Sequence, residues 1–430
     1  LANGSGSANA QAISSYGSFI IRSANTTSQA IYLFGDASGV TGAATSIGVN
    51  YSGTIEATGA GGGITVVGKG SSGTGYSLGA GLSGNVVANS GPITLVGDNS
   101  SATADGLNIG GLILGSNAGT NVTSSSSNIT LKGNQFGLNN TATFNTTGTV
   151  SLYSLDASNS FGSAQTFGSN WVFGSNVSGL TIGKSTNTQD ITIGSATSIA
   201  GLITIYGGAV TLNSSLTTIN STTGNIAITT TGLTGSGGIG LATGRALSVT
   251  QSGTSTYSGV VSGTSATLIK MGAGTLALTG TNTYTGDTTI SAGTLQLGNG
   301  VSTGSVASTN IINNGTLAFN FGADTSVANN ISGTGGVQVI GASRTLFSSF
   351  LSTTPQTIAS NTTVAEVLYR LSGANENGTA ISAGTNPASV YLKTFDPLTN
   401  TATFQVQMYD GTYTKMVFVK LTQSGTCLLY

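Results

Sequence analysis

The feature that most constrains this chain is a series of short strand motifs separated by glycine turns, with no helical interval between them. Residues 257–300 show it most clearly. In residues 275–279, Thr-Leu-Ala-Leu-Thr, polar and apolar side chains alternate, as they do in a half-buried strand. Glycines such as Gly272, Gly280 and Gly293 separate these motifs and supply the turns. This succession predicts a parallel β-solenoid.

One segment of this stretch carries a specific motif. It opens with Lys270, has Gly-Thr-Leu at residues 274–276 and again at 293–295, and has Asn-Thr-Tyr at 282–284 between them. From residue 270 to 298 it resembles the passenger-associated transport repeat of bacterial autotransporters, K-x-G-x-GTLxLxGxNTYxGxTxIxxGTLxLG. The resemblance implies a piece of right-handed β-helix near the end of a long secreted passenger, with a role in export and folding.

The alternation within this repeat also selects a core. If every second residue of a strand faces inward, the apolar positions form one buried face. We therefore predict a repeat core made of Leu276, Leu278, Ile290, Leu295 and Leu297.

The same kind of motif recurs over most of the chain. In residues 1–145, Ile-Thr-Val-Val-Gly (64–68), Ile-Thr-Leu-Val-Gly (93–97) and Ile-Thr-Leu-Lys-Gly (129–133) are one element repeated loosely. This region also resembles the strand repeats of filamentous-haemagglutinin-like secreted proteins. Residues 146–256 add further strand motifs at the density of a three-sided coil, and residues 257–345 hold the autotransporter-type repeats. Because one coil cannot bury its own apolar face, we predict a single parallel β-helix over residues 1–345.

The composition changes after about residue 350. Residues 363–373 carry Val364, Val367, Leu368 and Leu371 at helical spacing and end at a glycine. Alternating segments at residues 389–395, 401–409 and 412–421 follow, and Asp-Gly at 410–411 predicts a tight turn. We predict a small α+β domain over residues 351–430, with one helix on an antiparallel meander.

Charge and cysteine content exclude several functions. The chain has 12 acidic and 11 basic residues, a net charge of −1, so it lacks the basic patch of a nucleic-acid binder. It contains no stretch long and apolar enough for a transmembrane helix. Its single cysteine, Cys427, excludes a disulfide within the chain. The sequence opens at Leu1 without a basic start or an apolar signal segment, so we interpret Leu1 as an internal or mature start.

Catalytic and metal-binding patterns are weak. Without histidine, neither a Ser-His-Asp triad nor a Cys-His pair can form, and we predict no cofactor, no metal site and no enzymatic activity. A polysaccharide-degrading β-helix enzyme is the remote alternative, and its nearest acid–base pairs are Glu56 with Lys69 and Asp98 with Asp105. The lone Trp171 either stacks on a ligand or fills a corner of the core.

These features predict a secreted or surface-displayed structural and adhesive protein, and the resemblance to autotransporter passengers implies a Gram-negative bacterium. We expect it outside the cell or on the cell surface. Three export routes stay open: a separate outer-membrane exporter as a partner, a barrel that has been removed, or another route. Near-zero charge and open strand edges favour end-to-end self-association into a fibre, like that found in biofilms. The surfaces expected to join lie at the two ends: Leu1, Cys427, Leu428, Leu429 and Tyr430. The alternative is a monomeric adhesin that binds surface glycans.

Overall fold

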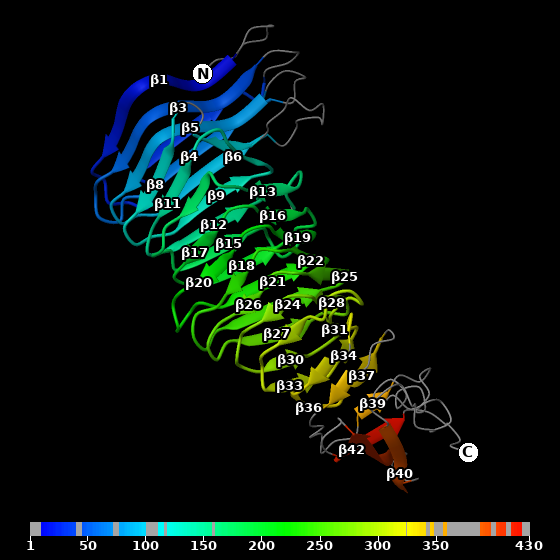
Figure 1. The fold of residues 1–430 in the computed structure, drawn as a ribbon. Helices are drawn as coiled ribbons and strands as arrows, with labels where there is room; N and C mark the ends of the chain where they lie inside the picture. Colours follow the sequence, from blue (N-terminus) through cyan, green and yellow to red (C-terminus); the bar gives the residue numbers. More distant parts are fainter. Residues whose placement is uncertain are drawn as a thin grey trace. The chain divides into compact units, whose positions relative to one another are not determined.

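The structure is a computed structural model that describes residues 10–39, 45–71, 77–99, 111–115, 118–156, 160–323, 325–340, 345–347, 356–358, 388–396, 401–409 and 414–423. Contacts divide the chain into two compact units, Leu1–Thr230 (unit 1) and Thr231–Tyr430 (unit 2). Within the described residues every regular element is a strand (Figure 1).

The described residues of unit 1 form 21 strands. They are β1 (Ala10–Ser23), β2 (Ile31–Asp36), β3 (Ser46–Ala57), β4 (Ile64–Lys69), β5 (Ser77–Ala88), β6 (Ile93–Asp98), β7 (Leu112–Leu114), β8 (Thr120–Ser124), β9 (Ile129–Gly133), β10 (Phe136–Leu138), β11 (Ala142–Asn145), β12 (Thr149–Tyr153), β13 (Gln165–Phe167), β14 (Trp171–Phe173), β15 (Gly179–Ile182), β16 (Ile191–Ile193), β17 (Thr197–Ile199), β18 (Leu202–Tyr206), β19 (Ala209–Leu212), β20 (Leu216–Thr218) and β21 (Ile226–Thr230).

These strands stack in chain order into parallel sheets. Sheet A runs β1-β3-β5-β8-β11-β14, and sheet B runs β2-β4-β6-β9-β12-β15-β18-β21. The side chains that face inward from sheet B form rows in register, and from β4 onward their apolar members are buried. One such row is Ile64, Ile93, Ile129, Val150, Leu180, Ile203 and Ile226. The repeated Ile-Thr motif therefore places its isoleucine in the core and its threonine outside.

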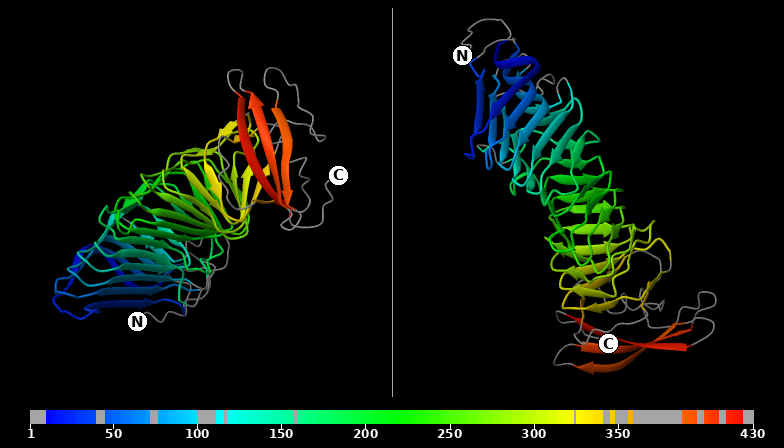
Figure 2. Two further views of the ribbon diagram at one scale, coloured as in Figure 1. Left: turned by 90° about the horizontal axis from the view of Figure 1, so that it is seen from below. Right: turned by 90° about the vertical axis from the view of Figure 1, so that its left-hand side faces the viewer.

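In the described part of the first coils of unit 1 the strands form two long faces, sheets A and B, which lie close together (Figure 2). Glycines occupy the line of closest approach: a Cβ added to Gly35 would lie 2.0 Å from the Gly48 carbonyl oxygen, and one added to Gly68 would lie 2.0 Å from the Gly79 oxygen. We call this line the glycine seam; it comprises Gly35, Gly48, Gly68, Gly79, Gly97 and Gly111. Most of these positions require glycine because there is no room for a side chain, and not because the chain turns there.

A third face begins where an aromatic cluster fills the interior. Trp171 is only 5% exposed and packs edge-on to Phe167, with ring centroids 5.0 Å apart, and against Phe144 at 5.7 Å. Phe136 contacts the same indole. Strand β13 lies in this region and starts a further parallel sheet, β13-β16-β19. Of the two roles considered for Trp171, the structure supports the core position.

Unit 2 also contains 21 strands in its described part. They are β22 (Gly232–Gly235), β23 (Ile239–Gly240), β24 (Ala246–Gln251), β25 (Thr254–Tyr257), β26 (Val261–Ser262), β27 (Thr267–Met271), β28 (Thr275–Leu278), β29 (Thr281–Asn282), β30 (Thr288–Ile290), β31 (Thr294–Leu297), β32 (Ser305–Val306), β33 (Asn310–Asn313), β34 (Thr316–Phe319), β35 (Thr325–Val327), β36 (Asn330–Ser332), β37 (Gly336–Val339), β38 (Thr345–Phe347), β39 (Gln356–Ile358), β40 (Ala388–Asp396), β41 (Thr401–Tyr409) and β42 (Thr414–Gln423).

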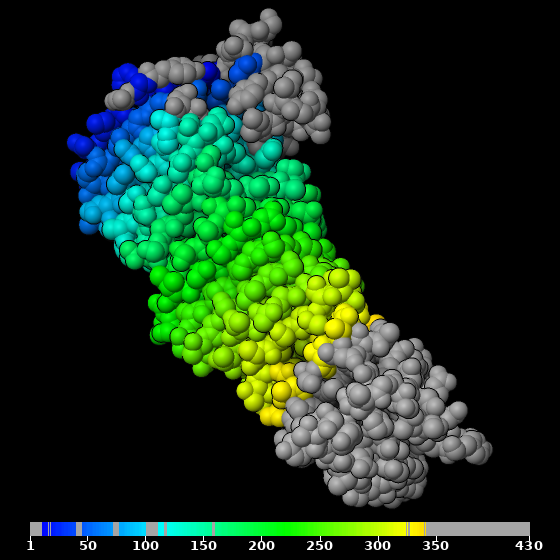
Figure 3. Space-filling model, in the orientation of Figure 1, coloured from blue at the N-terminus to red at the C-terminus, as the bar shows by residue number. Residues whose placement is uncertain are grey.

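Three successive strands make one coil in most of this unit. The first faces of the coils pair as β24-β27-β30-β33-β36 and the second as β22-β25-β28-β31-β34-β37. Equivalent residues of the first face are Leu268, Thr288, Ile311 and Ile331, which are 20, 23 and 20 residues apart. The space-filling view shows the described coils of unit 2 before residue 340 packed directly against one another (Figure 3). The predicted parallel β-helix is thus confirmed.

The last three strands differ from the coils. Strand β41 pairs antiparallel with both β40 and β42, as the sequence predicts for a meander. The predicted helix at residues 363–373 and the predicted turn at 410–411 lie outside the described residues. The predicted domain boundaries at residues 145, 256, 345 and 351 stay predictions.

Candidate functional site

The five predicted core residues of the repeat lie on three neighbouring strands of unit 2. Leu276 and Leu278 are on β28, Ile290 is on β30, and Leu295 and Leu297 are on β31; each is at most 2% exposed. Leu276 lies in register with Leu295, and Leu278 with Leu297. The two Gly-Thr-Leu motifs therefore form consecutive rungs of one apolar ladder.

The lysine that opens the repeat is inside the coil. Lys270 is fully buried and lies in register between Val249 and Ile290. Its Nζ donates hydrogen bonds to the carbonyl oxygens of Met271 at 2.8 Å, Gly272 at 2.9 Å and Ala292 at 3.4 Å. Burial lowers the pKa of Lys270 to about 8. The signal was present in the sequence, because Lys270 is two residues from inward-facing Leu268 and shares its face.

This burial predicts a pH-dependent stability for unit 2. Between the folded pKa of about 8 and the ordinary value of 10.5, the unfolded chain binds more protons at Lys270 than the folded chain does. The free energy of unfolding should therefore rise with pH across this window, by at most about 1.4 kcal/mol per pH unit. Burial raises the pKa of Tyr257 and Tyr284 above the ordinary 10, and their opposing effect begins only near that pH.

The measurement is urea unfolding of the wild type and of Lys270→Met between about pH 7.5 and about pH 9.5. We expect the wild type to gain stability relative to the variant as the pH rises. Equal slopes for the two proteins would show that Lys270 keeps its ordinary pKa in the fold.

A buried amide side chain of the repeat forms hydrogen bonds that link three successive coils. Asn282 is 1% exposed. Its Oδ1 accepts a hydrogen bond from the Val261 N–H of the preceding coil at 2.9 Å, and its Nδ2 donates to the Ser305 carbonyl of the following coil at 2.9 Å. Gln251 makes the same connection between the Leu233 N–H and the Thr275 carbonyl. We call Gln251 and Asn282 bracket amides.

Removing a bracket amide should be costly. In Asn282→Leu the Val261 N–H and the Ser305 carbonyl both lose a buried partner, and an unsatisfied buried group costs about 1–3 kcal/mol. We expect the free energy of unfolding to fall by about 3 kcal/mol, measured by urea unfolding. The matched control is Asn310→Leu, which removes an exposed hydrogen bond to Asp287 and should change the free energy by less than about 0.5 kcal/mol. If the two substitutions lower the free energy of unfolding equally, Asn282 does not stabilise the stack by linking its neighbouring coils.

A chain of buried hydroxyls connects the Asn-Thr-Tyr motif with the next coil. The Tyr284 hydroxyl lies 2.6 Å from Thr288 Oγ1, which lies 2.8 Å from Ser308 Oγ. All three residues are at most 1% exposed. Ser308 also lines a cavity.

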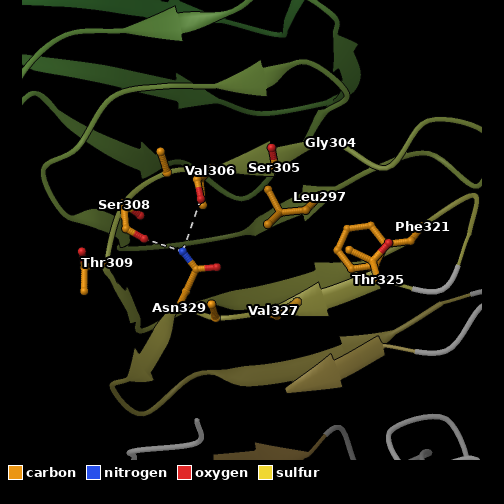
Figure 4. Close-up of a pocket in the computed structure, with 12 residues that line it drawn as sticks. Leu297, Gly304, Ser305, Val306, Ser308, Thr309, Phe321, Thr325, Val327 and Asn329 are labelled. Atoms are coloured by element: carbon orange, nitrogen blue, oxygen red, sulfur yellow. Dashed lines mark hydrogen bonds between the residues drawn. The ribbon is translucent and has the colours of Figure 1, made fainter. Parts of the chain in front are cut away.

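That cavity lies where the coil ladder is interrupted. Strand β32 pairs with β29, and β35 pairs with β38, but β32 and β35 do not pair with each other. On the other two faces of the same coils β31 pairs with β34 and β33 with β36. The resulting space is about 360 Å³ and is lined by Leu297, Gly304, Ser305, Val306, Ala307, Ser308, Thr309, Phe321, Thr325, Val327, Ala328 and Asn329. Figure 4 shows Leu297 between Asn329 at one end and Phe321 at the other.

The acid–base pairs considered for an enzyme have other partners. Glu56 forms an ion pair with Arg22 at 2.7 Å, and Lys69 Nζ lies over the Phe34 ring, 5.6 Å from its centre. Asp105 lies outside the described residues. In the part of the chain that the structure describes, no three residues of the His, Cys, Asp or Glu type come together as metal ligands. The same part has no helix with the length and apolar character needed to span a membrane.

The predicted surfaces for end-to-end joining lie outside this part of the chain. Leu1 and the segment Cys427, Leu428, Leu429 and Tyr430 are not among the described residues.

Comparison with known proteins supports the resemblance stated above. Residues 268–297 match the family model of the passenger-associated transport repeat. No curated protein and no solved structure matches the chain. The repeat and the parallel β-solenoid together fit an autotransporter passenger.

Proposed function

We propose that the chain is exported by an outer-membrane partner and displayed at the surface of a Gram-negative bacterium, where it acts as a non-enzymatic structural and adhesive β-solenoid. The observation that carries this proposal is the transport repeat at residues 268–297, whose strands β27 to β31 are built into the coil stack. Its Lys270 and Asn282 are buried and hydrogen-bonded to neighbouring turns, so the repeat belongs to the folded passenger.

The outer faces support an adhesive role. In unit 2, Thr254, Thr275, Thr294 and Thr316 lie in register on successive strands. In unit 1, Thr65, Thr94 and Thr130 do the same, and beyond the buried Ser151 the row continues with Thr181 and Thr204. Adjacent strands are about 4.8 Å apart, so these rows present closely spaced, uncharged hydroxyls suited to many weak contacts.

Cell fractionation tests the proposal. We expect the protein in the outer-membrane or medium fraction, and we expect a protease added to intact cells to digest it. Deleting residues 268–297 should reduce the exported fraction strongly. Deleting residues 203–225, one coil of unit 1 with no transport repeat, is the matched control and should leave more protein exported. Recovery from the cytoplasm alone would refute the proposal.

Self-association is the finer function that one observation favours. Phe19, Ile20, Tyr32 and Phe34 on β1 and β2 are 43–62% exposed, and the rings of Tyr32 and Phe34 stack with centroids 6.4 Å apart. The two pairs lie on strands of different sheets, and exposed apolar side chains of this size are typical of interaction surfaces. We propose that neighbouring copies of the chain cover both pairs and that repeated contacts build a fibre.

Sedimentation and electron microscopy distinguish this assembly from a monomeric adhesin. Replacing Phe19, Ile20, Tyr32 and Phe34 by serine should convert large species to monomers. Val301→Ser removes a separate apolar side chain that is 86% exposed and should leave the assembly unchanged. A wild type that stays monomeric at high concentration would exclude the fibre.

A further inference from the structure

We propose that the cavity between β32 and β35 binds a neutral sugar ring of a surface glycan. This inference rests on the proposed adhesive function and gives it a specific site. It starts from the interrupted ladder: β32 pairs with β29 and β35 pairs with β38, and these two described strands are not paired with each other.

The interruption is local and is held open by the rest of the coil. On the neighbouring faces the same two coils are joined by β31 with β34 and by β33 with β36. Asn329 bridges the gap in place of a backbone ladder: its Nδ2 donates to the Ser308 carbonyl and, at 3.4 Å, to the Val306 carbonyl (Figure 4). The cavity is therefore part of the folded coil, and a ligand need not pay to open it.

The lining determines the charge of the ligand. None of the twelve lining residues is acidic or basic. A charged group in this space would lose its hydration without gaining a counter-charge, which is unfavourable. The ligand must therefore be neutral.

The lining also indicates that the ligand has one apolar side and one side that forms hydrogen bonds. Leu297, Val306, Phe321 and Val327 are each at most 8% exposed and provide an apolar wall. Ser305 and Thr309 are exposed at the rim, where their hydroxyls provide donors and acceptors. A sugar ring has this combination, since its C–H face packs on an apolar or aromatic surface while its hydroxyls form hydrogen bonds at the rim.

The closed flanks argue against a peptide strand as the occupant. A strand added to the edge of β32 would have to continue past residues where β31–β34 and β33–β36 already pair. A compact ring needs no such passage. The wall is also fixed in place, because Ser308 is held through Thr288 by Tyr284 of the transport repeat.

The test is titration of the purified chain with small probes, followed by saturation-transfer NMR and calorimetry. The probes are the methyl glycosides of glucose, galactose and N-acetylglucosamine, with glucuronic acid and an uncharged tripeptide for comparison. We expect saturable binding of at least one methyl glycoside and none of glucuronic acid. Preferred binding of the tripeptide would instead identify a strand-edge site and overturn the proposal, as would failure of all three glycosides to bind.

Two variants test whether the glycoside binds in this cavity. Ala328 lines the cavity at its exposed rim, and Ala328→Phe should fill the space and weaken glycoside binding by about tenfold or more. Ala307→Phe, at a second exposed lining residue, serves the same purpose if Ala328→Phe does not fold. Ala60→Phe, on an exposed turn of unit 1, is the control and should bind like the wild type. Unchanged binding in a folded Ala328→Phe or Ala307→Phe would overturn the proposal.

This result is independent of export. Binding is measured on purified protein, whereas the export proposal depends on where the cell places the chain. If the chain is exported but binds no glycoside, the proposed sugar site is wrong and the proposed export stands. If the chain binds a glycoside but stays in the cytoplasm, the sugar site stands and the proposed export is wrong.

Discussion

Replacing Leu276 by aspartate is expected to unfold the coils of the transport repeat under conditions in which the wild type is stable. Leu276 is 1% exposed and lies in register between Ser255 and Leu295. The substitution removes an apolar side chain from the ladder and places a carboxylate where no cation lies opposite in these two neighbours. Truncating a buried leucine alone costs about 2–5 kcal/mol, and an unpaired buried charge adds to that.

We expect a loss of at least about 4 kcal/mol in the free energy of unfolding, seen as a lower urea midpoint and as faster amide hydrogen exchange in β28 and β31. Thr275→Asp is the matched control: it introduces the same carboxylate one residue earlier, on the outer face, and should cost less than about 1 kcal/mol. If both variants melt like the wild type, Leu276 does not support the fold.

Adding one methyl group at Gly68 is expected to have an effect of similar size. A Cβ at this position would lie 2.0 Å from the Gly79 carbonyl oxygen and 3.0 Å from the Ala80 Cβ. Backbone atoms cannot rotate away as a side chain can, and the strands on both sides are fixed by their ladders. Overpacking a tight interior costs about 1–3 kcal/mol, and contact with the backbone of two paired sheets places Gly68→Ala at or above the top of that range.

The control for this prediction is Gly168→Ala. No atom lies within 4 Å of a Cβ added to Gly168, and its φ is not in the left-handed region. The Gly168→Ala substitution lowers the conformational entropy of the unfolded chain. It should therefore leave the free energy of unfolding unchanged or raise it by up to about 1 kcal/mol. Thermal and urea unfolding of the two variants measure the difference. Equal stability would mean that the two faces of unit 1 can move apart at little cost.

The class of fold could be predicted because its signal is local and repeated. An Ile-Thr-Leu or Gly-Thr-Leu motif defines which side chain faces inward, and stacking repeats that choice from coil to coil. This is why the isoleucines at 64, 93 and 129 lie in one row although their spacing in sequence is unequal. The unequal spacing therefore leaves the register of this row unchanged.

Other features depend on distances between faces, which a strand pattern does not contain. Alternation shows that Gly68 faces inward but not that a second sheet comes within 2.0 Å of where its Cβ would be. The sequence marks Gly68 and Gly97 only by their repetition after Ile-Thr-x-Val. The same limit applies to the bracket amides: Asn282 is visible as part of a motif, whereas its contacts with Val261 and Ser305 require the stacked coils.

The cavity had no signal in the sequence. Ser305 and Thr325 are 20 residues apart, the spacing at which Leu268 and Thr288 do pair. The interruption arises from how the turns around them are placed, and those turns show no distinctive motif.

The bracket amides also set a minimum length for any stable fragment of this protein. Such a side chain is satisfied only when the coil before it and the coil after it are both present. Cutting the stack beside Gln251 or Asn282 would expose buried polar groups in a coil that was otherwise intact. A fragment for crystallography, display or engineering should therefore end at least one full coil beyond each bracket, and a single excised coil from this region has no independent existence.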